Sequence, residues 1–227
     1  MHFNKVLQLS DYDELQTEVA WLSTTMCTLR AKGVFTQLNH VHRRWEYGLA
    51  KALVDQEGKA LTIADTGSGA SMLGIGLCLD GHIVWETDSG DYGDPVDRLV
   101  HQCMTLGVEI PYVKQPVELM PDVPSDFFDV TLSISLMEHV GVDREKAGWS
   151  ELVRITKPGG VIFATMDFHP DPTIDTPFRE CQQTIYNEEH LYGVLDWLDC
   201  DSIDEPNWEY HGNLVNNYSF CTLAVRK

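Results

Sequence analysis

The chain has 227 residues, of which 43% are apolar, 22% charged and 10% aromatic. This length and composition are typical of one globular domain with a modest extension, and they exclude a chain that is mainly disordered. Because 35 acidic residues outnumber 16 Lys and Arg, the formal net charge is −19; such a surface repels phosphate backbones and disfavours nucleic acid as a partner.

The first part of the chain is predicted to be helical. A helix over residues 10–33 begins at the capping residue Ser10 and ends at Gly33, and a second helix covers residues 43–56. The densest basic cluster, residues 42–44, lies at the start of the second helix, where we interpret it as a solvated face. Both helices precede the first strong strand.

From residue 61 onward, short apolar strands alternate with helices. This repeated order predicts a mostly parallel sheet covered by helices on both faces, with ligands bound at the carboxyl ends of the strands. The predicted strands are residues 61–65, 82–88, 110–115, 128–135, 160–168 and 218–225, and the predicted helices are residues 70–79, 94–107, 144–156 and 187–199.

The first strand end, in the sequence LTIADTGSGAS, carries a glycine loop. Asp65 closes the strand, and Gly67 and Gly69 allow a tight turn and a close approach of the backbone to a ligand. The helix that follows presents unpaired amides and a positive dipole end. Such a loop can bind a polar or anionic small molecule, but two glycines also occur in purely structural turns.

The second strand end carries Asp88, which follows Asp65 by 23 residues. An acidic residue at this place can accept hydrogen bonds from both hydroxyls of a ribose. Glu86 is the nearby competitor, and either acid can instead be a solvated strand end. The combination of a glycine loop and a spaced acid predicts a nucleoside site.

Two residues indicate which nucleoside this is. A nicotinamide dinucleotide site has a third glycine where this chain has Met72, and Asp65 would repel a pyrophosphate. S-adenosylmethionine fits better, because its ammonium and sulfonium groups are cationic and its carboxylate can accept hydrogen bonds from the loop amides.

Four motifs then occur in the order of a known family. They are IADTGSGAS, VWETD, VELMPDVPSDFFDVTLSISLMEHV and LVRITKPGGVIFATMDF, and together they span roughly residues 61–168. In these motifs the chain resembles a class I S-adenosylmethionine-dependent methyltransferase of the small-molecule or glycan-pathway type. One departure is Ser71, which stands where the commoner loop GCGTG has a glycine; a serine there can still cap the helix.

The resemblance implies a Rossmann-like three-layer α/β fold with a seven-stranded sheet whose last strand is antiparallel. It implies a donor-binding methyltransferase domain over residues 60–227, and residues 1–59 would form an N-terminal helical extension that serves as a substrate lid. The resemblance also implies which residues bind the cofactor. The methionine end would lie over Asp65, Gly67, Ser68 and Gly69, and the ribose would bind Asp88. The adenine would lie near Val117 and Glu118, and Ser135 and Leu136 would complete the wall of the cofactor site.

Catalytic candidates lie at the ends of the fourth and fifth strands. Glu138 and His139 follow the fourth strand beside the expected methyl site, and a histidine there can take a proton at neutral pH; the pair can equally be structural. Asp167 and His169 follow the fifth strand, where they can orient or deprotonate an acceptor or can simply cap a loop. Ser135 stands where a metal-binding subgroup has a glutamate, so we expect no metal site.

A further candidate group precedes the sheet. Arg43 and Arg44 can bind an acidic group of a substrate, and Trp45 and Tyr47 can stack on a sugar or ring, although core packing is an equal alternative for these two aromatic residues. The Arg-Trp-Glu-Tyr stretch of residues 44–47 resembles stretches that precede the sheet in methyltransferases associated with surface-glycan pathways.

The sequence therefore predicts a methyltransferase that uses S-adenosylmethionine, releases S-adenosylhomocysteine, and methylates a small-molecule or glycan-like acceptor, more readily on oxygen than on nitrogen. The alternatives are a non-catalytic module that keeps the nucleoside pocket and, ranked last, a nicotinamide-dependent oxidoreductase.

The expected location is the cytoplasm. Six widely spaced cysteines without a Cys-x-x-Cys pair predict reduced thiols. The N-terminus lacks the pattern of a secretory signal, and the longest apolar run is far shorter than the roughly 20 residues of a membrane span.

Overall fold

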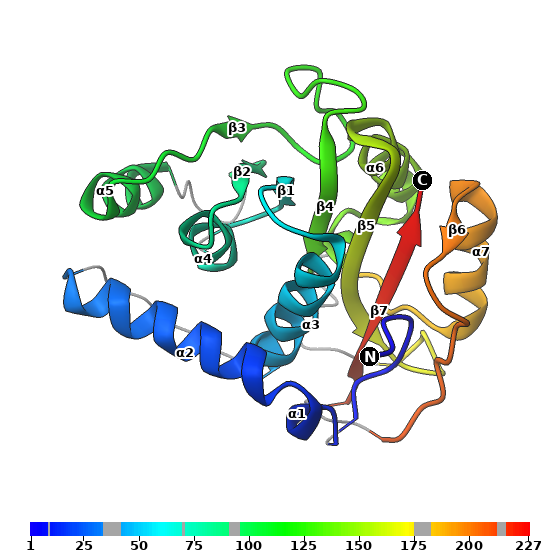
Figure 1. The fold of residues 1–227 in the computed structure, drawn as a ribbon. Coiled ribbons are helices and arrows are strands. Elements are labelled where there is room, and N and C mark those ends of the chain that lie inside the picture. Colours follow the sequence, from blue (N-terminus) through cyan, green and yellow to red (C-terminus); the bar gives the residue numbers. More distant parts are fainter. Residues whose placement is uncertain (9, 34–41, 70, 91–95, 175–182, 213–216) are drawn as a thin grey trace.

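The computed structural model describes residues 1–8, 10–33, 42–69, 71–90, 96–174, 183–212 and 217–227 (Figure 1). Its centre is a seven-stranded sheet in the order β3-β2-β1-β4-β5-β7-β6. The strands are β1 Thr62–Thr66, β2 Ile83–Asp88, β3 Tyr112–Lys114, β4 Phe128–Ile134, β5 Thr156–Phe168, β6 Asp201–Ser202 and β7 Ser219–Arg226.

Strand directions agree with the predicted topology. β3, β2, β1, β4 and β5 pair in parallel, whereas β7 is antiparallel to both β5 and β6. The fold class and the antiparallel last strand are therefore confirmed. β6 was not predicted, because two residues are too short to show a strand period.

The helices cover both faces of the sheet. They are α1 Asp11–Glu14, α2 Gln16–Ala31, α3 His42–Glu57, α4 Leu73–Leu79, α5 Val96–Leu106, α6 Val142–Ile155 and α7 Glu188–Leu198, and the short 3-10 turn η1 covers Met137–His139. Helices α2 to α5 lie on one face and α6 and α7 on the other (Figure 1). Successive side chains of β5 point to opposite faces of the sheet and so pack into two cores. Phe163 packs in the core under α2 to α5, and Ile162 and Ala164 pack in the core under α6 and α7.

Helix α3 is largely buried, although it precedes the sheet in the sequence. Every residue from 45 to 54 is buried, and Trp45 and Leu49 are fully enclosed in the first core. The residues before α1 form backbone hydrogen bonds with β7. The Leu7 amide donates to the Phe220 carbonyl at 2.9 Å, and the Thr222 amide donates to the Lys5 carbonyl at 2.9 Å. The division of the chain at residue 59 and the lid role remain predictions.

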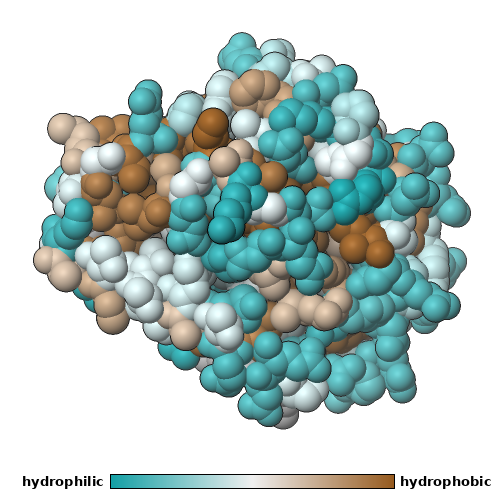
Figure 2. All heavy atoms as spheres, viewed as in Figure 1, coloured by the Kyte–Doolittle hydropathy of each residue, from teal (hydrophilic) through white to brown (hydrophobic). Residues whose placement is uncertain are grey.

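A gathering of apolar side chains is visible on the face drawn in Figure 2. In Figure 2 it lies over α5, where Val100 and Met104 are 51% and 80% exposed. Within the described ranges, none of the helices has both the length and the apolar character needed to cross a membrane. Five cysteines in these ranges are free thiols, and Cys181 lies outside the described residues.

Candidate functional site

The glycine loop predicted from the sequence forms a tight turn after β1. Gly67 and Gly69 have φ values of 63° and 53°, in the left-handed region that favours glycine. A Cβ atom on Gly67 would lie 2.5 Å from Cδ1 of Leu136, so the turn also depends on the missing side chain. Ser71 is not the N-cap of α4, which is Met72, but its hydroxyl accepts the amide of Leu73, the first residue of the helix, at 2.9 Å.

Asp88 is held at the end of β2, facing this turn. Its two carboxylate oxygens accept the amides of Gly69 at 2.8 Å and Gly90 at 2.7 Å. A carboxylate offers about four acceptor positions, so each oxygen keeps one for a further donor. The structure therefore brings together the glycine loop and the acid predicted to bind a ribose.

Asp65 and Glu86 lie side by side in the β1–β2 register, but in different surroundings. Glu86 is buried against α4, where a Cβ atom on Gly74 would lie 2.4 Å from its Oε1. Asp65 is also buried, and its Oδ2 meets no donor among the residues that the structure describes. Burial first, and then the nearby Asp88, raises the pKa of Asp65 to about 7. Asp65 therefore offers an acceptor atom that a cationic ligand can use.

The turn after β4 lies against the glycine loop and forms the other wall of the predicted cofactor site. Ser135 adopts the left-handed region with φ 46°, and its amide donates to both the carbonyl and the hydroxyl of Thr165, each at 3.0 Å. The next residue, Leu136, is the one that approaches Gly67. The two predicted wall residues thus lie against the predicted glycine loop.

Glu46 on α3 is a site residue that the sequence analysis missed. Its side chain is fully buried, and Oε1 accepts the hydroxyls of Ser135 and Thr165, both at 2.6 Å. Its Oε2 accepts Nη1 of Arg43 at 3.0 Å. The only signal in the sequence was an acid between two aromatic residues in a helix, which does not reveal partners about 90 and 120 residues away.

Arg43, Glu138 and Asp167 form a charged group beside this wall. Burial disfavours the Arg43 cation, but Glu46, Tyr47 and Glu138 outweigh it and raise the pKa of Arg43. Burial, followed by the neighbouring Asp167, raises the pKa of Glu138 well above its usual range. Burial, followed by Glu46, raises the pKa of Asp167 to about 8. The group therefore holds protons at neutral pH that ordinary carboxyls would have lost.

The two predicted histidines have different surroundings. His139 is half-buried, and burial, followed by Arg43, lowers its pKa and so favours the neutral ring. His169 instead engages its own loop, where its Nδ1 accepts the amide of Asp171 at 3.0 Å and its ring contacts Tyr210 at 5.2 Å between centroids. Of the pair, His139 is the one that lies near Arg43.

The remaining predicted residues are divided between core and surface. Trp45 is enclosed in the core and Arg44 is exposed, whereas Tyr47 is buried near Arg43 and Ser71, and burial raises its pKa to about 12. Val117 is buried, and Glu118 forms an ion pair with Arg144. The described residues contain no group of three side chains arranged to hold a metal ion.

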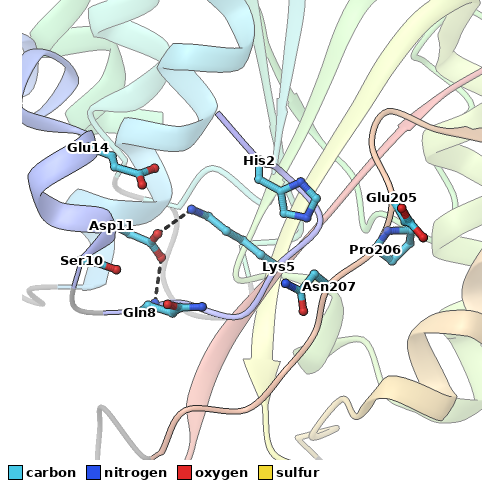
Figure 3. A pocket seen from close by; sticks show the side chains of 9 residues that line it. All are labelled: His2, Lys5, Gln8, Ser10, Asp11, Glu14, Glu205, Pro206 and Asn207. Carbon is cyan, nitrogen blue, oxygen red and sulfur yellow. Dashed lines mark hydrogen bonds and ion pairs between the residues drawn. The ribbon is translucent and has the colours of Figure 1, made fainter.

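Two cavities differ in their position relative to the charged group. One of about 660 Å³ borders the charged group, because its lining residues Gln183 and Thr184 donate to the Asp167 carboxylate and, at 2.7 Å, to the Glu138 carbonyl. The other, of about 650 Å³, is lined by the Lys5–Asp11 ion pair and by residues such as His2 and Glu205 (Figure 3). None of the predicted site residues lines either of these two cavities.

Comparison with known proteins shows what this arrangement is similar to. Residues 65–164 match the family model described as "Methyltransferase domain". A "Ubiquinone biosynthesis O-methyltransferase" from Paramagnetospirillum magneticum is 38% identical over 141 residues, which cover 62% of this chain and 50% of that protein. The chain spans about half the length of the curated relatives it matches.

Solved structures share the fold at low identity. The 1,6-didemethyltoxoflavin-N1-methyltransferase of Burkholderia thailandensis, solved with 1,6-didemethyltoxoflavin and S-adenosylhomocysteine, has a TM-score of 0.66 at 14% identity and covers 93% of this chain and 89% of its own. The cyclase SpnF has a TM-score of 0.64 at 14% identity, with 98% and 97% covered. The family match covers a little under half of the chain, and together with the order of the motifs and the sheet topology it supports a class I S-adenosylmethionine-dependent methyltransferase.

Proposed function

We propose that the protein transfers a methyl group from S-adenosylmethionine to a hydroxyl oxygen of a small-molecule or glycan-like acceptor. The family supports the donor, and the name of the P. magneticum relative supports oxygen as the methylated atom. The observation that carries the proposal is Asp88, whose carboxylate is fixed by two backbone amides beside a glycine turn and keeps acceptor positions for a ribose.

The residues present fit the donor. The buried, unpartnered Oδ2 of Asp65 suits the cationic methionine end, and the left-handed Gly67 and Gly69 allow its close approach. Asp88 would hold the ribose, and Val117 would lie against the adenine. S-adenosylmethionine supplies a methyl carbon that is activated by its bond to a positively charged sulfur.

The charged group contains carboxyls that can take the proton lost by the acceptor hydroxyl. When the acceptor oxygen bonds to the methyl carbon and the carbon–sulfur bond breaks, the hydroxyl proton needs a base. Asp167 lies near the end of β5 and Glu138 lies in η1 after β4, and both are buried. The cavity of about 660 Å³ is lined by Gln183 and Thr184, which donate to the Asp167 carboxylate and to the Glu138 backbone carbonyl. We assign the proton to the ionised form of Asp167, which Arg43 stabilises and which becomes populated as the pH rises toward 8; His169, engaged with its own loop, has no part in this step.

Isothermal titration calorimetry with S-adenosylmethionine and S-adenosylhomocysteine tests the donor. We expect heat from both ligands and competition between them; no heat from either would refute the proposal. The acceptor is then sought by incubating the protein with cell extract and methyl-labelled donor, and by screening for products that gain one labelled methyl group.

Asp88→Ala is expected to weaken S-adenosylhomocysteine binding by about 1–3 kcal/mol, because ribose hydrogen bonds to a charged group are lost. Asp129→Ala is the matched control. Asp129 lies at the opposite end of the sheet and also accepts a backbone amide, from Thr62 at 2.8 Å. Its loss should lower the melting temperature but leave the dissociation constant unchanged; equal constants for Asp88→Ala and the wild type would contradict the assignment.

A second function is favoured by one comparison. The cyclase SpnF has this fold over nearly the whole chain, so the fold alone does not decide the reaction. Tight binding of S-adenosylhomocysteine without transfer to any acceptor in the extract would favour a protein that keeps the nucleoside pocket for another purpose.

A further inference from the structure

We propose that Glu46 is a positioning residue of the donor site: its carboxylate holds both the turn after β4 and Arg43 in the arrangement that receives the methionine end of the donor. This inference rests on the proposed function. It concerns a residue on the helix before the sheet, outside the four motifs that carry the family resemblance.

The first support is the hydrogen bonding of a fully buried carboxylate. One oxygen of Glu46 accepts two hydroxyls, from Ser135 and Thr165 at 2.6 Å each, and the other accepts Nη1 of Arg43 at 3.0 Å. Ser135 belongs to the turn after β4 and Thr165 to β5, so a single side chain joins α3 to both strands. A buried charge satisfied in this way specifies one geometry, since each partner would lose its hydrogen bond in any other.

The second support is the strained turn that Glu46 stabilises. Ser135 has the left-handed φ of 46°, a conformation that non-glycine residues adopt only when their surroundings compensate. Its amide bonds to Thr165, and its hydroxyl bonds to Glu46. Because Leu136 follows directly and fills the space above Gly67, the hydrogen bonds of Glu46 also set the position of the wall against the glycine loop.

The third support is the surroundings of Arg43. Glu46 makes the direct ion pair, while Glu138, Asp167 and Asp65 attract the same guanidinium from further away. Removing the charge of Glu46 would leave Arg43 to move toward the other carboxylates. The guanidinium would then lose the position from which it acts on both Asp65 and Asp167.

The experiment compares Glu46→Gln and Ser135→Ala with the wild type, with S-adenosylhomocysteine as the titrated probe. We expect Glu46→Gln to bind about tenfold more weakly, the equivalent of about 1.4 kcal/mol, and Ser135→Ala to lose affinity in the same direction. In the double variant the losses should not add, because both substitutions break the same contact. If Glu46→Gln does not fold, the affinity of Ser135→Ala for S-adenosylhomocysteine still tests the inference.

Glu57→Gln is the matched control on the same helix. Glu57 pairs with Arg226 at 2.7 Å, so its substitution also removes an ion pair from α3, but it lies far along the helix from Arg43. We expect it to keep wild-type affinity, whereas a merely structural role of Glu46 would change the melting temperature and not the affinity. Wild-type binding in Glu46→Gln and Ser135→Ala would overturn this inference alone; no binding by the wild type would overturn the proposed function together with it.

Discussion

Gly67→Ala is expected to lower the free energy of unfolding by about 2–4 kcal/mol and to weaken S-adenosylhomocysteine binding. Two costs combine in this substitution. The left-handed backbone at φ 63° disfavours any side chain, and the new Cβ atom would lie 2.5 Å from Cδ1 and 2.9 Å from Cγ of Leu136. Urea unfolding and calorimetric titration measure the two effects.

Gly69→Ala separates the backbone cost from the steric cost. Gly69 is also left-handed, at φ 53°, but its added Cβ atom would meet nothing within 4 Å among the described residues. We therefore expect it to lose only about 1–2 kcal/mol. Adding Leu136→Ala to Gly67→Ala should cost less than the sum of the single substitutions; simple additivity would show that Leu136 does not crowd Gly67.

Asp167→Asn is expected to make the protein more stable than the wild type at alkaline pH, by about 3 kcal/mol more at pH 8.5 than at pH 5.5. The pKa of Asp167 is about 8 in the folded protein, well above that of an exposed aspartate. A carboxyl with a raised pKa stabilises the fold while it is protonated, and this contribution disappears as the pH rises toward 8. Asparagine has no such proton to lose.

Urea unfolding at several pH values between 5.5 and 8.5 measures this difference. The ionisable groups that act on Asp167 are Arg43 and Glu46 from α3, Glu138 from η1, and Tyr218 and Cys221 from the last part of the chain. Asp13→Asn, at an exposed position of α1, is the control and should follow the wild type. Parallel curves for Asp167→Asn and the wild type would show that Asp167 ionises normally.

The part of the site that the sequence predicted is the part encoded by local pattern. Gly67, Gly69 and Asp88 are recognisable because each follows a strand with a clear apolar period, and parallel strands bring their carboxyl ends to one edge. Ser71 lies one residue before the N-cap Met72, and its hydroxyl still accepts the first amide of α4. These residues need only short-range structure to reach their positions.

The part that the sequence did not predict depends on tertiary contacts. Glu46 reads as an ordinary helix acid until the fold places it beside Ser135 and Thr165. The raised pKa of Asp167 likewise needs burial that no local pattern reveals. His169 follows β5 in the sequence, but its Nδ1 accepts the amide of Asp171 in its own loop, a contact that the strand pattern does not reveal.

The pairing of the first residues with β7 has a consequence for how the chain folds. The side chain of Asn4 accepts the Ala224 amide at 2.6 Å and donates to the Ala224 carbonyl at 3.1 Å, a contact between positions 220 apart. Such contacts carry a large loop-closure cost and form late. During synthesis, the first residues therefore wait until β7 leaves the ribosome, and β5 keeps an open edge until then. A chain stalled before β7 would expose that edge to other nascent chains.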